Sequence, residues 1–130
     1  MRRNKNIYLP STSDIKILIT VEELNKDNLY PLPQGVFKIL SASGEDEFLA
    51  YRHLSTYGTL LSYSSKHISR LIMMLVRNKY LEKIYDRNTD SLCLKISPKG
   101  TTFLLDYRKK HKYLFIKKEA NKKPLIIEIK

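Results

Sequence analysis

The chain has 130 residues and a formal net charge of +11. This length suits one domain, and 42% hydrophobic with 28% charged residues is a globular rather than a disordered balance. A single cysteine excludes a disulfide framework and a multi-cysteine zinc site. The longest apolar run, residues 71–76, is too short to cross a membrane. The basic start lacks the apolar stretch of a signal peptide, so we expect a cytoplasmic protein.

The positive charge is confined to the second half of the chain. Residues 1–60 hold seven basic and seven acidic side chains, whereas residues 61–130 hold seventeen basic and six acidic ones. A one-sided basic surface attracts polyanions, nucleic acid before acidic membranes or acidic proteins. A lysine-rich composition that only maintains solubility is the alternative. The asymmetry favours nucleic-acid binding.

The first half predicts short helices. Residues 1–12 are expected to form a flexible arm, and residues 13–26 follow with apolar positions at helical spacing. Several β-branched side chains in that segment leave a strand as the alternative. Pro33 suits the first turn of a second helix, which would end near Gly44. Residues 48–61 predict a further short helix.

Residues 65–80 form the clearest predicted element. Ser64 or Ser65 is placed to cap an amphipathic helix. Its apolar stripe is expected to comprise Ile68, Leu71, Ile72, Leu75, Val76 and Tyr80. Lys66, Arg70 and Arg77 lie off this stripe, which predicts a basic exposed face. A solvated surface with no binding role is the alternative.

A hairpin and a last helix are expected next. Residues 81–85 and 92–96 predict two strands, and residues 86–90 have the composition of a turn. Pro98 opens a helix that runs into the basic residues 108–112.

This order of elements predicts a mainly helical α+β fold, a winged helix-turn-helix with a two-stranded wing and an extra N-terminal helix. We expect the winged-helix domain to span residues 13–112. Residues 113–130 would be a basic C-terminal extension, able to form a hairpin or to supply a dimer strand.

Residues 35–105 resemble the winged-helix domain at the C-terminal side of RecQ helicases, the RQC domain. The residues behind the resemblance are V-F-K-I-L from Val36, R-H-L-S-T-Y-G from Arg52, Y-L-E from Tyr80 and S-P-K-G from Ser97. The resemblance implies a helix within residues 14–26 and binding to duplex DNA or to a duplex–single-strand junction. The sequence shows no helicase motor and no four-cysteine zinc module. It therefore resembles a free-standing, minor RQC-type DNA-binding protein of bacteria, expected on the nucleoid.

Some members of the family part base pairs with an aromatic residue at the wing tip. The predicted tip, residues 86–90, holds none, and Tyr85 at its base is expected to pack within the strands. Strand separation is therefore not expected of this chain.

We expect DNA binding through residues 65–80 as a recognition helix and through a basic wing, and the candidate DNA contacts come from three elements. Ser65 and the amides at its helix start would hold a phosphate, while Lys66 and Arg70 would reach phosphates or base edges. The expected nucleic-acid-binding residues are Ser65, Lys66, Arg70, Arg77, Arg87, Asn88 and Lys99. Three more stay open: Ser55 and Thr56, which bond a phosphate or the local backbone, and His67, which faces DNA or only solvent.

Nothing in the sequence predicts an enzyme. His53, His67 and His111 have no ligand cluster around them, and Cys93 is expected to be a half-buried filler. We therefore expect no catalytic residue, metal, cofactor or small-molecule substrate. One alternative function is an interaction module that docks on a helicase or another replication or repair protein. The other is a winged-helix repressor that binds a palindromic site as a dimer.

Overall fold

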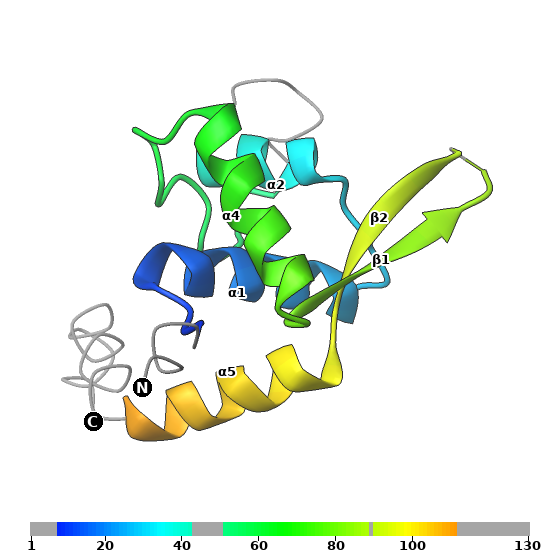
Figure 1. Ribbon diagram of the computed structural model, residues 1–130. Helices are drawn as coiled ribbons and strands as arrows, with labels where there is room; N and C mark the ends of the chain where they lie inside the picture. Colours follow the sequence, from blue (N-terminus) through cyan, green and yellow to red (C-terminus); the bar gives the residue numbers. More distant parts are fainter. Residues whose placement is uncertain (1–7, 43–50, 89, 112–130) are drawn as a thin grey trace, which may run out of the picture.

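The computed structural model describes residues 8–42, 51–88 and 90–111. The elements in chain order are α1 (Thr12–Lys26), α2 (Pro33–Leu40), α4 (Ser65–Arg77), β1 (Leu81–Asp86), β2 (Ser91–Ile96) and α5 (Pro98–Lys110). Figure 1 shows α1 between the α2–α4 pair on one side and α5 on the other, with the β1–β2 hairpin projecting from this helical body. The mainly helical α+β prediction is confirmed.

Helix α1 settles the choice between helix and strand for its segment. Ser11 is its N-cap, and Ser11 and Asp14 form a capping box, each side chain accepting from the other's backbone amide. Ile17, Leu18 and Val21 are fully buried. The β-branched residues disfavour a helix only slightly, and packing of one face against neighbouring helices overrides that preference.

Helix α4 is shorter than predicted. It starts after Ser64, whose side chain accepts from the amide of His67, and it ends at Arg77 rather than at Tyr80. Lys79 adopts φ +70°, and the amide of Tyr80 donates to the carbonyl of Leu75 at 2.9 Å. This is a Schellman motif, which turns the chain out of the helix and into the wing.

The expected stripe of α4 is confirmed with a narrower centre. Ile68, Ile72 and Leu75 are buried, whereas Leu71 and Val76 are only partly buried at its edges.

The prediction of a helix at residues 48–61 is wrong for the residues that the structure describes. Residues 51–62 form successive turns, and residues 48–50 lie outside the described ranges. The amide of Gly58, at φ +71°, donates to the carbonyl of Ile39 at 2.9 Å. The amide of Leu60 donates to the carbonyl of Leu40 at 3.0 Å. The turns therefore bond the end of α2 instead of forming a helix of their own.

The hairpin pairs Leu81 with Ile96 at its base and Asp86 with Ser91 near its tip. Its base is hydrogen-bonded to the end of α1 and to the α1–α2 connection. The side chain of Asn25 accepts from the amide of Ile96 at 2.8 Å and donates to the carbonyl of Leu29 at 2.9 Å. The amide of Leu94 donates to the carbonyl of Pro31 at 2.8 Å. The amides of Ile96 and Leu94 thus join the base of the wing to the helical body.

Burial along β2 departs from simple alternation. Leu94 and Cys93 are both buried, while Leu92 is 48% exposed. Cys93 is thus more deeply buried than the half-buried filler expected from the sequence, and Leu92 lies beyond the reach of the core.

Helix α5 begins at Pro98, with Ser97 as its N-cap, and ends at Lys110. The expected hairpin within residues 113–130 lies outside the described residues. None of the helices described here combines the length and hydropathy needed to span a bilayer.

Candidate nucleic-acid interface

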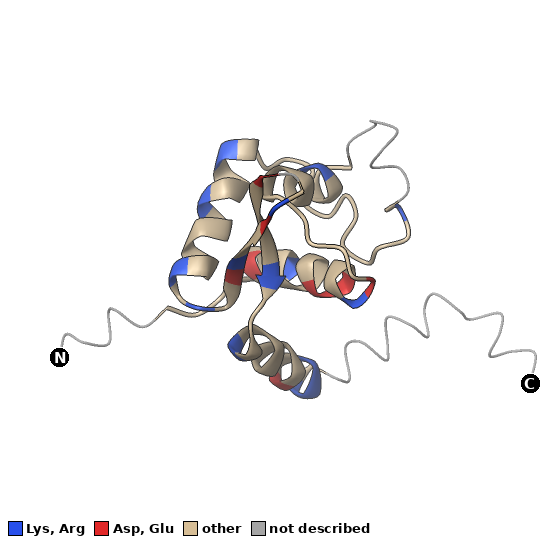
Figure 2. Ribbon diagram, turned by 90° about the vertical axis from the view of Figure 1, so that its right-hand side faces the viewer, with Lys and Arg blue, Asp and Glu red and all other residues tan. Residues whose placement is uncertain are grey.

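One face of α4 is basic along its whole length. Lys66, Arg70 and Arg77 are exposed, and they fall within about 40° of one another around the helix axis. The helix contains no Asp or Glu (Figure 2). Arg108 pairs with Glu22 and Lys110 with Asp106, and neither of these ion pairs involves α4. These three charges are therefore available to an anionic partner.

Met73 also lies on this face, a position that was not expected from the sequence. Its side chain is 54% exposed, and its helical angle lies between those of Ser69 and the basic stripe. The signal was in the sequence: Met73 lies seven residues after Lys66 and three after Arg70. An exposed apolar side chain thus lies at the edge of the basic stripe.

The start of α4 presents exposed polar groups. Ser64 is the N-cap, so Ser65 is the first helical residue, and its side chain is exposed. The ring of His67 stacks on Tyr63 with centroids 4.6 Å apart, and the Tyr63 hydroxyl lies 2.6 Å from that of Ser13. Tyr63 therefore covers one face of the His67 ring, while the His67 side chain remains exposed to solvent.

The wing contributes less charge than expected. Arg87 and Asn88 are exposed at the tip, where the amide of Asn88 donates to Asp86 at 3.0 Å. Residues 81–96 carry three acidic and three basic side chains. The wing as a whole is neutral, and the expectation of a basic wing applies only to Arg87 at its tip.

Tyr85 does not pack within the strands, and that prediction is wrong. It is 58% exposed and lies opposite Leu92 in the ladder, which is also exposed. The hydroxyl of Tyr85 donates to Asp90, and this hydrogen bond raises the pKa of Tyr85. An exposed apolar pair therefore stands just behind the wing tip, because the hairpin extends past the core.

Three other candidates already have partners inside the protein. The ammonium of Lys99 donates to the carbonyl of Asn78 at 2.9 Å. The hydroxyl of Ser55 donates to Glu23 at 2.9 Å, and the buried hydroxyl of Thr56 is bonded to Thr20. The hydroxyls of Ser55 and Thr56 thus bond side chains of α1 rather than the local backbone. The Glu23 carboxylate would also repel a phosphate there.

The helical body, the basic helix α4 and the two-stranded wing together define a winged-helix domain. The model of the RQC domain family matches residues 16–123. The chain therefore belongs to the RQC domain family, and the resemblance seen in the sequence is confirmed. A search of curated proteins finds no match.

Proposed function

We propose that this chain binds DNA and catalyses no reaction, with α4 in the major groove and the wing tip on the flanking backbone. One observation supports this above the others: α4 exposes Lys66, Arg70 and Arg77 on one stripe and has no carboxylate to neutralise them. The RQC domain is a non-catalytic winged-helix domain, which agrees with a binding role. In a bacterium such a protein would be found on the nucleoid.

The dimensions of α4 fit the proposed contact. Lys66 and Arg77 are separated by about 16 Å along the axis at the usual helical rise. A B-DNA major groove, about 12 Å wide, admits a helix with its side chains. Lys66 and Arg70 are one turn apart and would reach the same groove. Ser65 and the first amides of α4 would face a phosphate, where the helix dipole favours negative charge.

The wing would add contacts from the side. Arg87 projects from the tip with Asn88 beside it, and one such cation suits one phosphate. The exposed Tyr85–Leu92 pair lies behind them and would meet sugar or base surface at a duplex end. Lys99 is a weaker candidate, because reaching a phosphate would require it to share its ammonium with Asn78.

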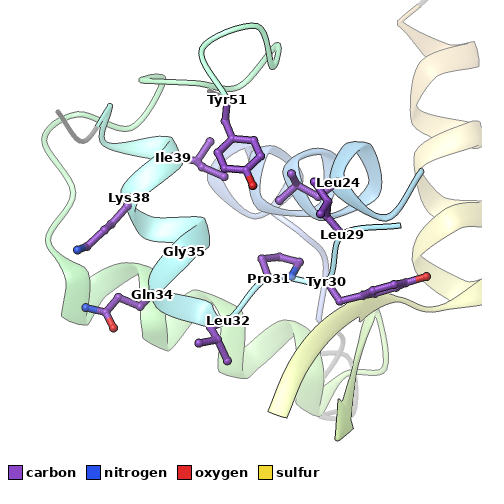
Figure 3. A pocket seen from close by; sticks show the side chains of 10 residues that line it. All are labelled: Leu24, Leu29, Tyr30, Pro31, Leu32, Gln34, Gly35, Lys38, Ile39 and Tyr51. Carbon is purple, nitrogen blue, oxygen red and sulfur yellow. The ribbon is translucent and has the colours of Figure 1, made fainter. Parts of the chain in front are cut away.

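A specific feature favours protein docking as the second candidate function. An apolar pocket of about 360 Å³ lies between α2, the α1–α2 connection and Tyr51 (Figure 3). Leu29, Tyr30 and Leu32 line it and are 41%, 38% and 43% exposed. Exposed apolar side chains around a pocket are typical of protein-binding surfaces. A helicase or another replication or repair protein would be the partner in this case.

Salt dependence of binding to a blunt duplex separates the two functions. We expect the logarithm of the affinity to fall linearly with the logarithm of salt concentration, with a slope that corresponds to roughly four to eight phosphate contacts. A slope near zero, or no binding at low salt, would contradict the DNA proposal and leave docking as the remaining one.

Charge reversal locates the contact. Arg70→Glu should weaken duplex binding strongly, and adding Lys66→Glu should remove most of the affinity, because both side chains lie on the proposed groove face. Lys26→Glu makes the same change in charge at the exposed end of α1 and should have a much smaller effect. Melting temperatures of all variants should stay close to that of the wild type. Equal losses for Arg70→Glu and Lys26→Glu would show that only overall charge matters.

A further inference from the structure

A row of aromatic rings runs along α5. The ring of Tyr80 meets Phe103 edge-on with centroids 5.6 Å apart, Phe103 stacks with Tyr107 at 6.4 Å, and Tyr107 meets His111 at 4.2 Å. Phe103, Tyr107 and His111 recur every four residues, so they share one side of the helix. We call Tyr80, Phe103, Tyr107 and His111 the ring ladder.

The ring ladder is only partly used by the core. Tyr80 is buried and contacts Tyr8 as well as Phe103. Phe103, Tyr107 and His111 keep part of their surface accessible. Phe103 and Tyr107 also pack against the core. Helix α5 is further anchored by Leu104, which is fully buried, and by the ion pair between Arg108 and Glu22 at 2.8 Å. Core packing therefore leaves part of the surface of these three side chains accessible to a ligand.

An open hollow of about 560 Å³ lies at the first end of the ring ladder. Its lining residues are Tyr80, Pro98, Lys99, Thr102, Phe103 and Asp106. Phe103 and Pro98 thus provide apolar surface, and the ammonium of Lys99 stands 4.5 Å from the centre of the buried Tyr80 ring. Asp106 is paired with Lys110 at 3.2 Å, so the site is not left with an uncompensated negative charge.

The hollow adjoins the end of the basic face of α4. Lys99 donates to the carbonyl of Asn78, which is the C-cap of α4 and follows Arg77 directly. A strand that leaves the α4 face past Arg77 would therefore meet Lys99 next and then the ring ladder. At the far end of α5, Lys109 is exposed and adds positive charge, whereas Arg108 and Lys110 are paired with Glu22 and Asp106.

We propose that the ring ladder is the site that binds a single-stranded DNA arm continuing from a duplex held on α4. The inference rests on the proposed function, since α4 must first hold the duplex. Bases would stack on Phe103 and Tyr107 while Lys99 and Lys109 contact the phosphates. Rings interleaved with basic side chains are the usual platform for single strands, and stacking tolerates any base.

The test compares a blunt duplex with the same duplex carrying an oligothymidine arm, by fluorescence anisotropy. In the wild type the arm should raise affinity about tenfold, the effect of stacking one or two bases. The double variant Phe103→Leu/Tyr107→Leu keeps apolar bulk but removes both rings, and it should lose this gain while binding the blunt duplex as the wild type does. Leu105→Ala is the matched control, because Leu105 is 55% exposed on the same helix outside the ring ladder.

The outcomes separate the two proposals. If the wild type binds the blunt duplex but the arm adds nothing, or if the double variant keeps the gain, the ring ladder is not a strand site and duplex binding still stands. If the wild type binds no duplex at low salt, the proposed function itself fails. Should the double variant melt below the assay temperature, 5-iodouracil in the arm provides a test on the wild-type protein. Cross-links to Phe103 or Tyr107 support the inference, and cross-links only to other residues overturn it.

Discussion

Gly100, near the start of α5, lies directly against the carbonyl of Tyr80. A Cβ atom at position 100 would stand 2.3 Å from the Tyr80 carbonyl oxygen and 2.9 Å from Cγ1 of Ile96. Ser97 joins the same contact: its hydroxyl donates to the Tyr80 carbonyl at 2.9 Å, and its oxygen accepts from the amide of Gly100 at 3.0 Å. The end of α4, the base of the wing and the start of α5 are therefore joined at one point.

Gly100→Ala should accordingly destabilise the protein by about 2–3 kcal/mol, because the methyl group meets a backbone oxygen that cannot move without shifting β1. Urea unfolding measures the loss. Thr101→Ala, one residue further along the same helix, should change the free energy of unfolding by less than about 1 kcal/mol. Similar stability of the two variants would show that α5 is not packed this closely on Tyr80.

Lys79 adopts φ +70° in the Schellman motif that ends α4. Lys79→Gly should stabilise the protein by about 0.5–1 kcal/mol, since glycine relieves the left-handed strain at some cost in chain entropy. Lys79→Ala removes the same side chain but keeps Cβ, so it should give no such gain. Thermal unfolding of the pair tests this, and equal melting temperatures would contradict it.

The narrow centre of the α4 stripe also makes a prediction. Ile72 is 2% exposed, whereas Leu71 lies at the edge of the core. Ile72→Ala should cost about 2–5 kcal/mol because it leaves a cavity. Leu71→Ala should cost clearly less, since solvent and neighbouring side chains can fill the space. Equal losses for the two variants would show that Leu71 lies at the centre of the stripe rather than at its edge.

Arg87→Ala tests the wing. The loss of one exposed contact to a phosphate should weaken binding by about 1 kcal/mol, with little change in melting temperature. We expect the same loss on the blunt and the armed duplex, because Arg87 would contact only the double-stranded part. If Arg87→Ala abolished binding of the armed duplex alone, the wing tip, with the exposed Tyr85–Leu92 pair behind it, would be reading the junction instead.

Local sequence determined much of this protein. Several signals lie within one turn of the element that they define. They are the period of apolar residues in α4, Ser64 and Ser97 at N-caps, and Pro33 and Pro98 at first helical positions. The hairpin followed from two apolar runs around a turn-forming segment. The basic stripe of Lys66, Arg70 and Arg77 followed from the same helical period, because a helix that buries one face exposes the other.

Tertiary structure decided what depends on residues far apart in the chain. The side chain of Asn25 bonds Ile96, 71 residues away, and no local pattern predicts such a partner. The hydroxyls of Ser55 and Thr56 likewise bond side chains of α1 that are distant in the sequence. Packing against neighbouring helices also makes α1 a helix despite its β-branched residues. The exposure of Tyr85 was decided by where the core ends along the hairpin. Burial is set by the elements that pack around a residue, and a sequence pattern determines only which face of its own element that residue occupies.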